Sequence, residues 1–70
     1  MSNKAQRLKD TITNHLTDAG KRRSGYSWSF AYGYIIGMSD AIAVDDDISV
    51  KEMGELLSYM YDNILPLYED

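Results

Sequence analysis

Side chains that could do covalent chemistry are scarce in this chain. Its 70 residues include one histidine, His15, and no cysteine. The chain therefore lacks the residues for a catalytic pair built from a thiol or from two imidazoles. Neither a disulfide nor a structural zinc site of the usual cysteine and histidine type is expected. A glycine-rich phosphate-binding loop is also missing. We expect a protein that is not an enzyme and that needs no cofactor.

The acidic run Asp45, Asp46 and Asp47, followed by Glu52, is the pattern nearest to a metal site. A calcium-binding loop needs acids at alternating positions, a glycine at its sixth place and a glutamate at its twelfth, and this run lacks that pattern. The run is more typical of a solvated loop that places negative charge near the start of the next helix. Asp40 stands within an apolar stretch, and we expect it to act as a cap, to pair with a base or to be partly exposed.

The basic run Lys21, Arg22 and Arg23, followed by Tyr26 and Trp28, combines charges that could contact phosphates with rings that could stack on bases. A dimeric nucleic-acid-associated regulator that uses this basic N-terminal third is therefore an alternative function. The net charge of −4 ranks it second, because nucleic-acid modules are usually basic. Its other basic groups would be Lys4, Arg7 and Lys9.

Charge is distributed unevenly along the chain. Residues 1–23 hold six of the seven basic groups and two acids, a net +4, whereas residues 24–70 hold nine acids and Lys51, a net −8. Such polarity can steer binding to a charged partner, or let two copies meet basic end to acidic end. The predicted acidic edge, which could mimic nucleic acid, consists of Asp45, Asp46, Asp47, Glu52, Glu55 and Asp62.

Residues 26–38, YSWSFAYGYIIGM, carry no charge and most of the aromatic side chains. Large residues alternate with small ones, which fits a strand, but Ser29, Gly33, Gly37 and Ala41 recur every four residues, which fits a helix that another helix approaches closely. We favour the helix because a lone long strand would lack partners, and the strand remains the alternative. The segment is too polar for a membrane span.

The sequence GYIIGMSDA, residues 33–41, resembles the GYxxGxxDA helix of immunity proteins that neutralise type VI secretion amidases. The resemblance covers these nine residues and carries no functional residue over to this chain. It implies that the segment is helical.

Helices are predicted at about residues 3–19, 27–44 and 50–65. Ser2 can cap the first helix and Gly20 can end it, whereas Ser49 with Glu52 forms a capping box for the third. In the second helix, Gly33 and Gly37 should form a groove opposite one wide apolar face. That face would hold Trp28, Phe30, Ala31, Tyr34, Ile35, Met38, Ala41 and Ile42.

Together these features predict a small all-α domain, residues 1–70, of three helices around the glycine-containing second one. Because one core of this size leaves apolar surface uncovered, we expect a homodimeric helical bundle. A cytoplasmic location is expected, since the N-terminus lacks the apolar region of a secretory signal.

The function that this composition favours is a small acidic inhibitor or adaptor, of the kind that phages and mobile elements encode. It would bind another protein, a larger and nucleic-acid-processing enzyme, and block it. The aromatic residues expected to anchor that partner are Trp28, Tyr32, Tyr59, Tyr61 and Tyr68.

Overall fold

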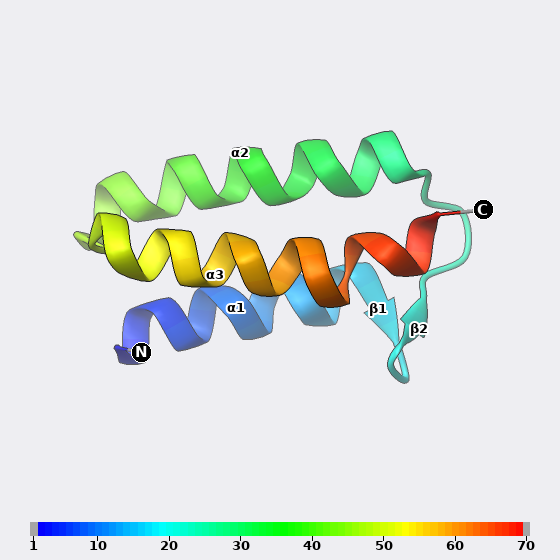
Figure 1. The fold of residues 1–70 in the computed structure, drawn as a ribbon, viewed down its shortest axis with the longest axis horizontal. Helices are drawn as coiled ribbons and strands as arrows, with labels where there is room; N and C mark the ends of the chain where they lie inside the picture. The colour runs from blue at the N-terminus through cyan, green and yellow to red at the C-terminus, as the bar shows by residue number, and fades with distance from the viewer. Residues whose placement is uncertain (1, 70) are drawn as a thin grey trace.

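Three α-helices and a short β-hairpin make up the fold (Figure 1). The computed structural model describes residues 2–69, apart from the side chains of Ala43, Asp45 and Asp46. In chain order the elements are α1 (Asn3–Leu16), β1 (Thr17–Asp18), β2 (Lys21–Arg22), α2 (Trp28–Asp46), α3 (Val50–Asn63) and the 3-10 helix η1 (Leu65–Tyr68). The predicted all-α class with three helices is confirmed, and the hairpin is an addition to it.

A serine begins each of the three helices. The hydroxyl oxygens of Ser2, Ser27 and Ser49 each accept a hydrogen bond from the backbone N–H three residues later, at 3.2, 3.1 and 3.1 Å. Each bond satisfies one of the amide groups that have no partner within the first turn of a helix. The predicted caps at Ser2 and Ser49 are therefore present.

The first helix is shorter than predicted, because it ends at Leu16 and not at Ala19. Thr17 leaves the helix in an extended conformation, and its hydroxyl donates to the carbonyl of Thr13 at 2.7 Å. Ala19 and Gly20 both adopt positive φ, 53° and 78°, between the antiparallel strands β1 and β2. Positive φ at both central residues defines the type I′ turn of two-residue hairpins. Gly20 thus serves a hairpin turn and not a helix cap.

The other two helices differ from prediction mainly at their ends. The second helix runs from Trp28 to Asp46 and not over residues 27–44. The third ends at Asn63, after which Pro66 sits in the first turn of η1. A proline cannot supply the N–H that would continue an α-helix, so the chain tightens into the 3-10 turn.

The helices lie side by side along the long axis of the molecule, with α3 in front between α2 above and α1 below in Figure 1. Each helix contacts the other two, and the extents along the principal axes are 34, 20 and 16 Å. Buried apolar side chains from all three helices and η1 fill the space between them. The core consists of Leu8, Ile12, Leu16, Ala31, Ile35, Leu56, Met60, Ile64, Leu65 and Tyr68.

One side of α2 packs in or against this core, within the part of the chain that the structure describes. Ala31, Ile35 and Ser39 are buried, whereas Trp28 and Phe30 are 40% and 44% exposed. The predicted wide apolar face is therefore present in part. Tyr34, Met38 and Ile42 pack half-buried against the core beside Ala31 and Ile35, whereas Trp28, Phe30 and Ala41 are exposed. Among the described residues, no helix has both the length and the apolar character needed to cross a membrane.

Tyr68 closes the end of the bundle where the chain finishes. Its side chain is 2% exposed, and its hydroxyl donates to the carbonyl of Leu16 at 2.7 Å. That carbonyl belongs to the last turn of α1, where carbonyl groups lack partners within the helix. The prediction that Tyr68 is an exposed anchor is wrong, because the 3-10 turn folds its ring into the core.

Candidate functional site

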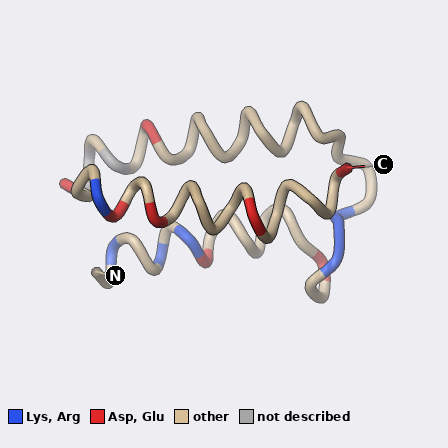
Figure 2. The backbone as a smooth tube through the Cα atoms, viewed as in Figure 1, with Lys and Arg blue, Asp and Glu red and all other residues tan. Residues whose placement is uncertain are grey.

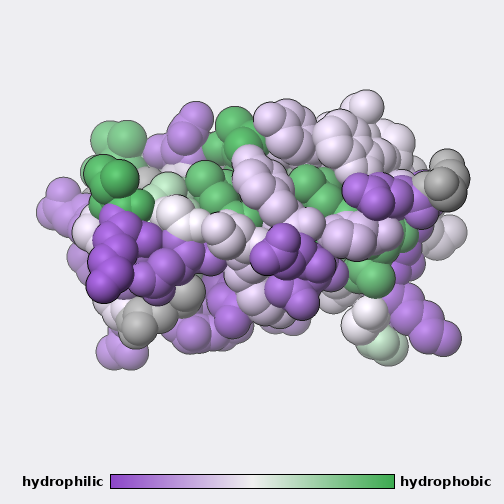
Figure 3. All heavy atoms as spheres, viewed as in Figure 1, coloured by the Kyte–Doolittle hydropathy of each residue, from purple (hydrophilic) through white to green (hydrophobic). Residues whose placement is uncertain are grey.

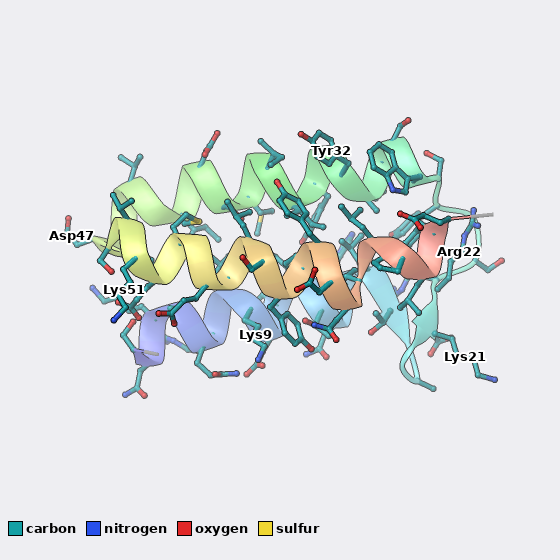
Figure 4. All side chains as sticks on the ribbon, viewed as in Figure 1. Lys9, Lys21, Arg22, Tyr32, Asp47 and Lys51 are labelled. Carbon is teal, nitrogen blue, oxygen red and sulfur yellow. The ribbon has the colours of Figure 1, made fainter. Side chains whose placement is uncertain are left out.

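A ladder of three aromatic side chains lies exposed across α2 and α3. The rings of Trp28 and Tyr32 stack at 5.2 Å between centroids, with 7° between their planes, because residues four apart lie on one side of a helix. The ring of Tyr61 on α3 continues the stack at 6.3 Å and 19° from Tyr32. Figure 4 shows Tyr32 on α2, above α3. We call Trp28, Tyr32 and Tyr61 the aromatic ladder.

Partial burial raises the pKa of Tyr61, and the neighbouring Tyr32 adds to this effect. The hydroxyl of Tyr61, like that of any tyrosine, can donate a hydrogen bond to a partner. Tyr61 and Tyr32 remain 38% and 41% exposed. Rings that stack in order and still face water are typical of a binding surface, because they offer apolar area at low conformational cost.

Aliphatic side chains extend this apolar surface toward the other end of α2 and α3. Val50 is 91% exposed and Val44 is 79% exposed. Between them and the ladder, Ile36 and Leu57 are half-buried. Figure 3 shows hydrophobic residues at the left and middle of the upper half of this side of the molecule, residues of intermediate hydropathy toward the right, and hydrophilic residues along much of the lower half.

The predicted acidic edge is only partly assembled by the fold. Glu55 and Asp62 are exposed on α3, close in sequence to Tyr61. Asp47 is exposed at the far end of the molecule, after α2, and Figure 2 shows how the acids spread along α3. The side chains of Asp45 and Asp46 lie outside those that the structure describes. In sequence, Asp62 follows Tyr61 directly and Glu55 precedes it by six residues.

Glu52, the remaining member of the acidic edge, has a structural contact. Its Oε2 atom accepts a hydrogen bond from the backbone N–H of Ser2 at 2.6 Å, which joins the start of α3 to the start of α1. This bond is the main cause that lowers the pKa of the Glu52 carboxyl. The carboxylate of Glu52 thus holds two helix ends together.

A second aromatic cluster lies on the other side of α2, against α1. The ring of His15 stacks on Tyr34 at 4.4 Å between centroids, and the hydroxyl of Tyr26 lies 3.4 Å from its Nε2 atom. Phe30 packs against Tyr26 at 4.5 Å. Burial raises the pKa of Tyr34, and Tyr26 contributes. The sequence offered no local signal for this cluster, because His15 meets rings that come much later in the chain.

The small residues of α2 lie on its exposed side. Ser29, Gly33, Gly37 and Ala41 are all exposed, and a Cβ atom built on Gly33 or Gly37 would meet nothing within 4 Å. No helix of the described chain crosses α2 at this stripe. The close helix crossing that the spacing predicts is therefore not formed within one molecule, and Gly54 on α3 likewise has nothing within 4 Å.

The basic run is held at the hairpin end of the molecule. The Nη2 atom of Arg23 donates to the carbonyl of Asn14 at 2.9 Å, and the Nη2 atom of Arg22 donates to the carbonyl of Tyr26 at 2.9 Å. Lys21 is exposed and points away from the bundle in Figure 4. Both arginines thus stabilise the connection between α1 and α2, in addition to carrying charge.

The remaining basic groups of the N-terminal third do not join this run. The ammonium of Lys9 lies 3.9 Å from the centroid of the Tyr59 ring, a cation–π contact between α1 and α3. Lys4 and Arg7 lie in the first turns of α1, and Figure 2 shows basic residues at opposite ends of the molecule. The predicted anchor Tyr59 is therefore half-buried under Lys9, apart from the aromatic ladder.

Among the described residues, no group of three or more histidines and acids is placed to hold a metal ion. Comparison of the chain with protein-family models, curated proteins and solved structures finds no match. The described surface of α2 and α3 carries exposed rings, exposed aliphatic groups and exposed carboxylates.

Proposed function

We propose that this chain is a non-enzymatic protein-binding module, an inhibitor or adaptor that binds and blocks a larger enzyme. The observation that carries the proposal is the aromatic ladder. Its three rings are stacked in order, and each leaves about two fifths of its surface in water. Tryptophan and tyrosine are the side chains on which protein interfaces most often depend, since they bury large areas and keep a polar group for the partner.

The charge near the ladder supports a class of partner. Glu55 and Asp62 lie on α3, the helix that supplies Tyr61, and both are exposed. Such a surface complements an apolar patch rimmed by lysine and arginine. Enzymes that act on nucleic acid present basic surfaces to their substrate, so the proposed partner is an enzyme of that class. The module would then compete with the nucleic acid for the enzyme.

Site-specific photo-crosslinking in the native host tests the proposal. A photoreactive phenylalanine analogue replaces Tyr61, and as a matched control it replaces Asn14, which is exposed on the opposite helix α1. We expect one dominant adduct from position 61 and none from position 14. The absence of an adduct at 61, or the same adducts from both positions, would count against the proposal.

The purified partner then allows a quantitative test. We expect the enzyme's activity to fall as the chain is added in equimolar amounts. Tyr61→Ala should weaken inhibition by roughly 30-fold or more, as for a central anchor worth about 2 kcal/mol. Glu55→Gln should act mainly by slowing association at low salt. An enzyme that binds the chain but keeps full activity would exclude the inhibitor form and leave an adaptor.

A further inference from the structure

The side of α2 that faces away from the core is apolar and exposed. Ser29, Gly33 and Gly37 line its middle, and Phe30 and Tyr32 flank it at 44% and 41% exposure. We call these five residues the outer face of α2. In the described chain, α1 and α3 both contact α2, and they bury Ala31, Ile35 and Ser39 on its opposite side. The outer face is therefore uncovered in one molecule.

We propose that a second copy of this chain packs on the outer face, with the two α2 helices antiparallel. A glycine within a helix costs about 1 kcal/mol relative to alanine. Nothing inside the molecule requires glycine at positions 33 and 37, because a Cβ atom at either position would meet nothing within 4 Å. The cost of these glycines is therefore not offset by a close contact within the chain. The surface that Gly33 and Gly37 form between Phe30 and Tyr32 instead leaves room for the backbone of a second helix. Such a helix can approach closely only where side chains are small.

Charge complementarity identifies the second copy as the occupant. The helix α2 ends in aspartates and has no basic residue in its last turn, so acids lie at the negative pole of the helix dipole. The other end of α2 lies on the side of the molecule that carries Lys21 and Arg22, as Figure 4 shows, with Asp47 at the opposite end. In an antiparallel pair, the acidic end of each helix meets the positive pole and the basic hairpin of the other.

Asp40 discriminates between the two directions of packing. It is exposed and lies near the outer face, one turn beyond Gly37. If Gly33 of one copy faces Gly37 of the other, Asp40 lies beside the first turn of the second copy's α2, close to the positive pole of that helix dipole. A parallel pair would instead bring the two Asp40 carboxylates to the same level, and like charges there repel.

The solution mass of the intact chain tests the dimer. We expect light scattering at high concentration to give twice the 8.0 kDa mass of the chain, falling to one chain on dilution. Gly37→Leu should give one chain at every concentration with an unchanged helical circular dichroism spectrum, because the added side chain has free space within the monomer. Gly54→Leu, at a glycine of α3 that is equally open within the chain, is the matched control and should keep the dimer.

Three outcomes would overturn the proposal: a wild-type chain that stays at 8.0 kDa throughout the dilution series, a dimer that survives Gly37→Leu, or a dimer that Gly54→Leu disrupts equally. The first would leave the outer face to a foreign protein. Tyr61→Ala, which tests the proposed function, should leave the mass unchanged. Failure of the dimer and failure of the binding function are thus distinguished.

Cysteine crosslinking tests the direction, since the chain contains no cysteine of its own. Ser29→Cys and Ala41→Cys variants are mixed under mild oxidation. The antiparallel pair should give mainly the mixed disulfide, because position 29 of one copy faces position 41 of the other. A predominance of links between two copies of Ser29→Cys would contradict the antiparallel arrangement.

Discussion

At the scale of single residues, two polar contacts bind distant parts of the chain. The hydroxyl of Tyr68 reaches the carbonyl of Leu16, and the carboxylate of Glu52 reaches the N–H of Ser2. The first is buried and the second is exposed. They lie at opposite ends of α1, so each end of that helix is attached to the C-terminal half. Their different burial predicts different behaviour on substitution.

Replacing Tyr68 by phenylalanine should lower the free energy of unfolding by about 1–3 kcal/mol, because the buried carbonyl of Leu16 would lose its donor while the ring stays in the core. The thermal midpoint should fall by roughly 4–8 °C per kcal/mol in a domain of this size. Urea denaturation followed by circular dichroism measures it. Tyr61→Phe, on an exposed ring, is the control and should change stability little. An equal loss in both variants would contradict the assigned role of the bond.

Glu52 should make stability depend on pH. Its pKa is lower in the folded chain, chiefly through the bond from Ser2. Such a carboxyl stabilises the fold above its unfolded pKa, and this contribution disappears as the pH falls through the folded pKa. The Glu52→Gln variant should thus have a lower thermal midpoint than wild type at pH 7, and the difference should vanish in acid. A difference between the two midpoints that persists in acid would contradict this role of the bond from Ser2.

At the scale of the elements, the hairpin between α1 and α2 positions the start of α2. Its turn residues, Ala19 and Gly20, both have positive φ. Arg22 and Arg23 then attach the following segment to the carbonyls of Tyr26 and Asn14. These bonds hold the segment that leads from the hairpin into α2.

Removing the backbone strain at Ala19 in the hairpin turn should stabilise the folded chain. Ala19 adopts φ of 53°, a conformation that costs an alanine roughly 1–2 kcal/mol and a glycine almost nothing. Ala19→Gly should therefore raise the free energy of unfolding by about 1 kcal/mol, less the extra entropy of the unfolded glycine. Gly20→Ala, at φ of 78°, should have the opposite effect. Thermal unfolding of both variants measures the difference, and a destabilised Ala19→Gly would contradict a strained turn.

At the scale of the whole molecule, apolar surface is concentrated on α2 and α3, whereas α1 carries a more polar exterior. The exposed large hydrophobic residues among those described are Trp28, Phe30, Tyr32, Val44, Val50 and Tyr61, and each belongs to α2 or α3. One side of α2 is proposed to meet a second copy, and the ladder across α2 and α3 is proposed to meet a partner, with Tyr32 at the edge that the two surfaces share. A molecule of this size leaves such surface uncovered because its core is small.

The proposed dimer should couple stability to concentration. Anything that binds the folded chain but not the unfolded chain raises its unfolding temperature by mass action. The thermal midpoint of the wild-type chain should therefore rise as the chain is concentrated, and that of Gly37→Leu should not. Calorimetry at several concentrations makes the measurement. A wild-type midpoint independent of concentration would contradict dimerisation coupled to folding.

Local patterns predicted the helices because helix starts depend on neighbouring residues. Ser2 and Ser49 cap helices as their spacing indicates, and Pro66 prevents α3 from continuing. The end of α1 was predicted wrongly, because its apolar spacing continues to Ala19 while the hairpin competes for the same residues. The only local sign of the two-residue hairpin in the sequence is Gly20. The pairing of β1 with β2 could therefore not be predicted from neighbouring residues.

The sequence by itself determined three helices, an acidic character and an aromatic second helix, because these follow from composition and from spacing within one segment. Only the tertiary structure decided which aromatic rings are exposed. Trp28 and Tyr32 form a ladder with Tyr61, whereas Tyr68 is buried. The sequence alone does not distinguish an apolar residue in the core from one on the surface. Its exposure depends on which side of its helix the other helices cover, and that depends on contacts between residues far apart in the chain.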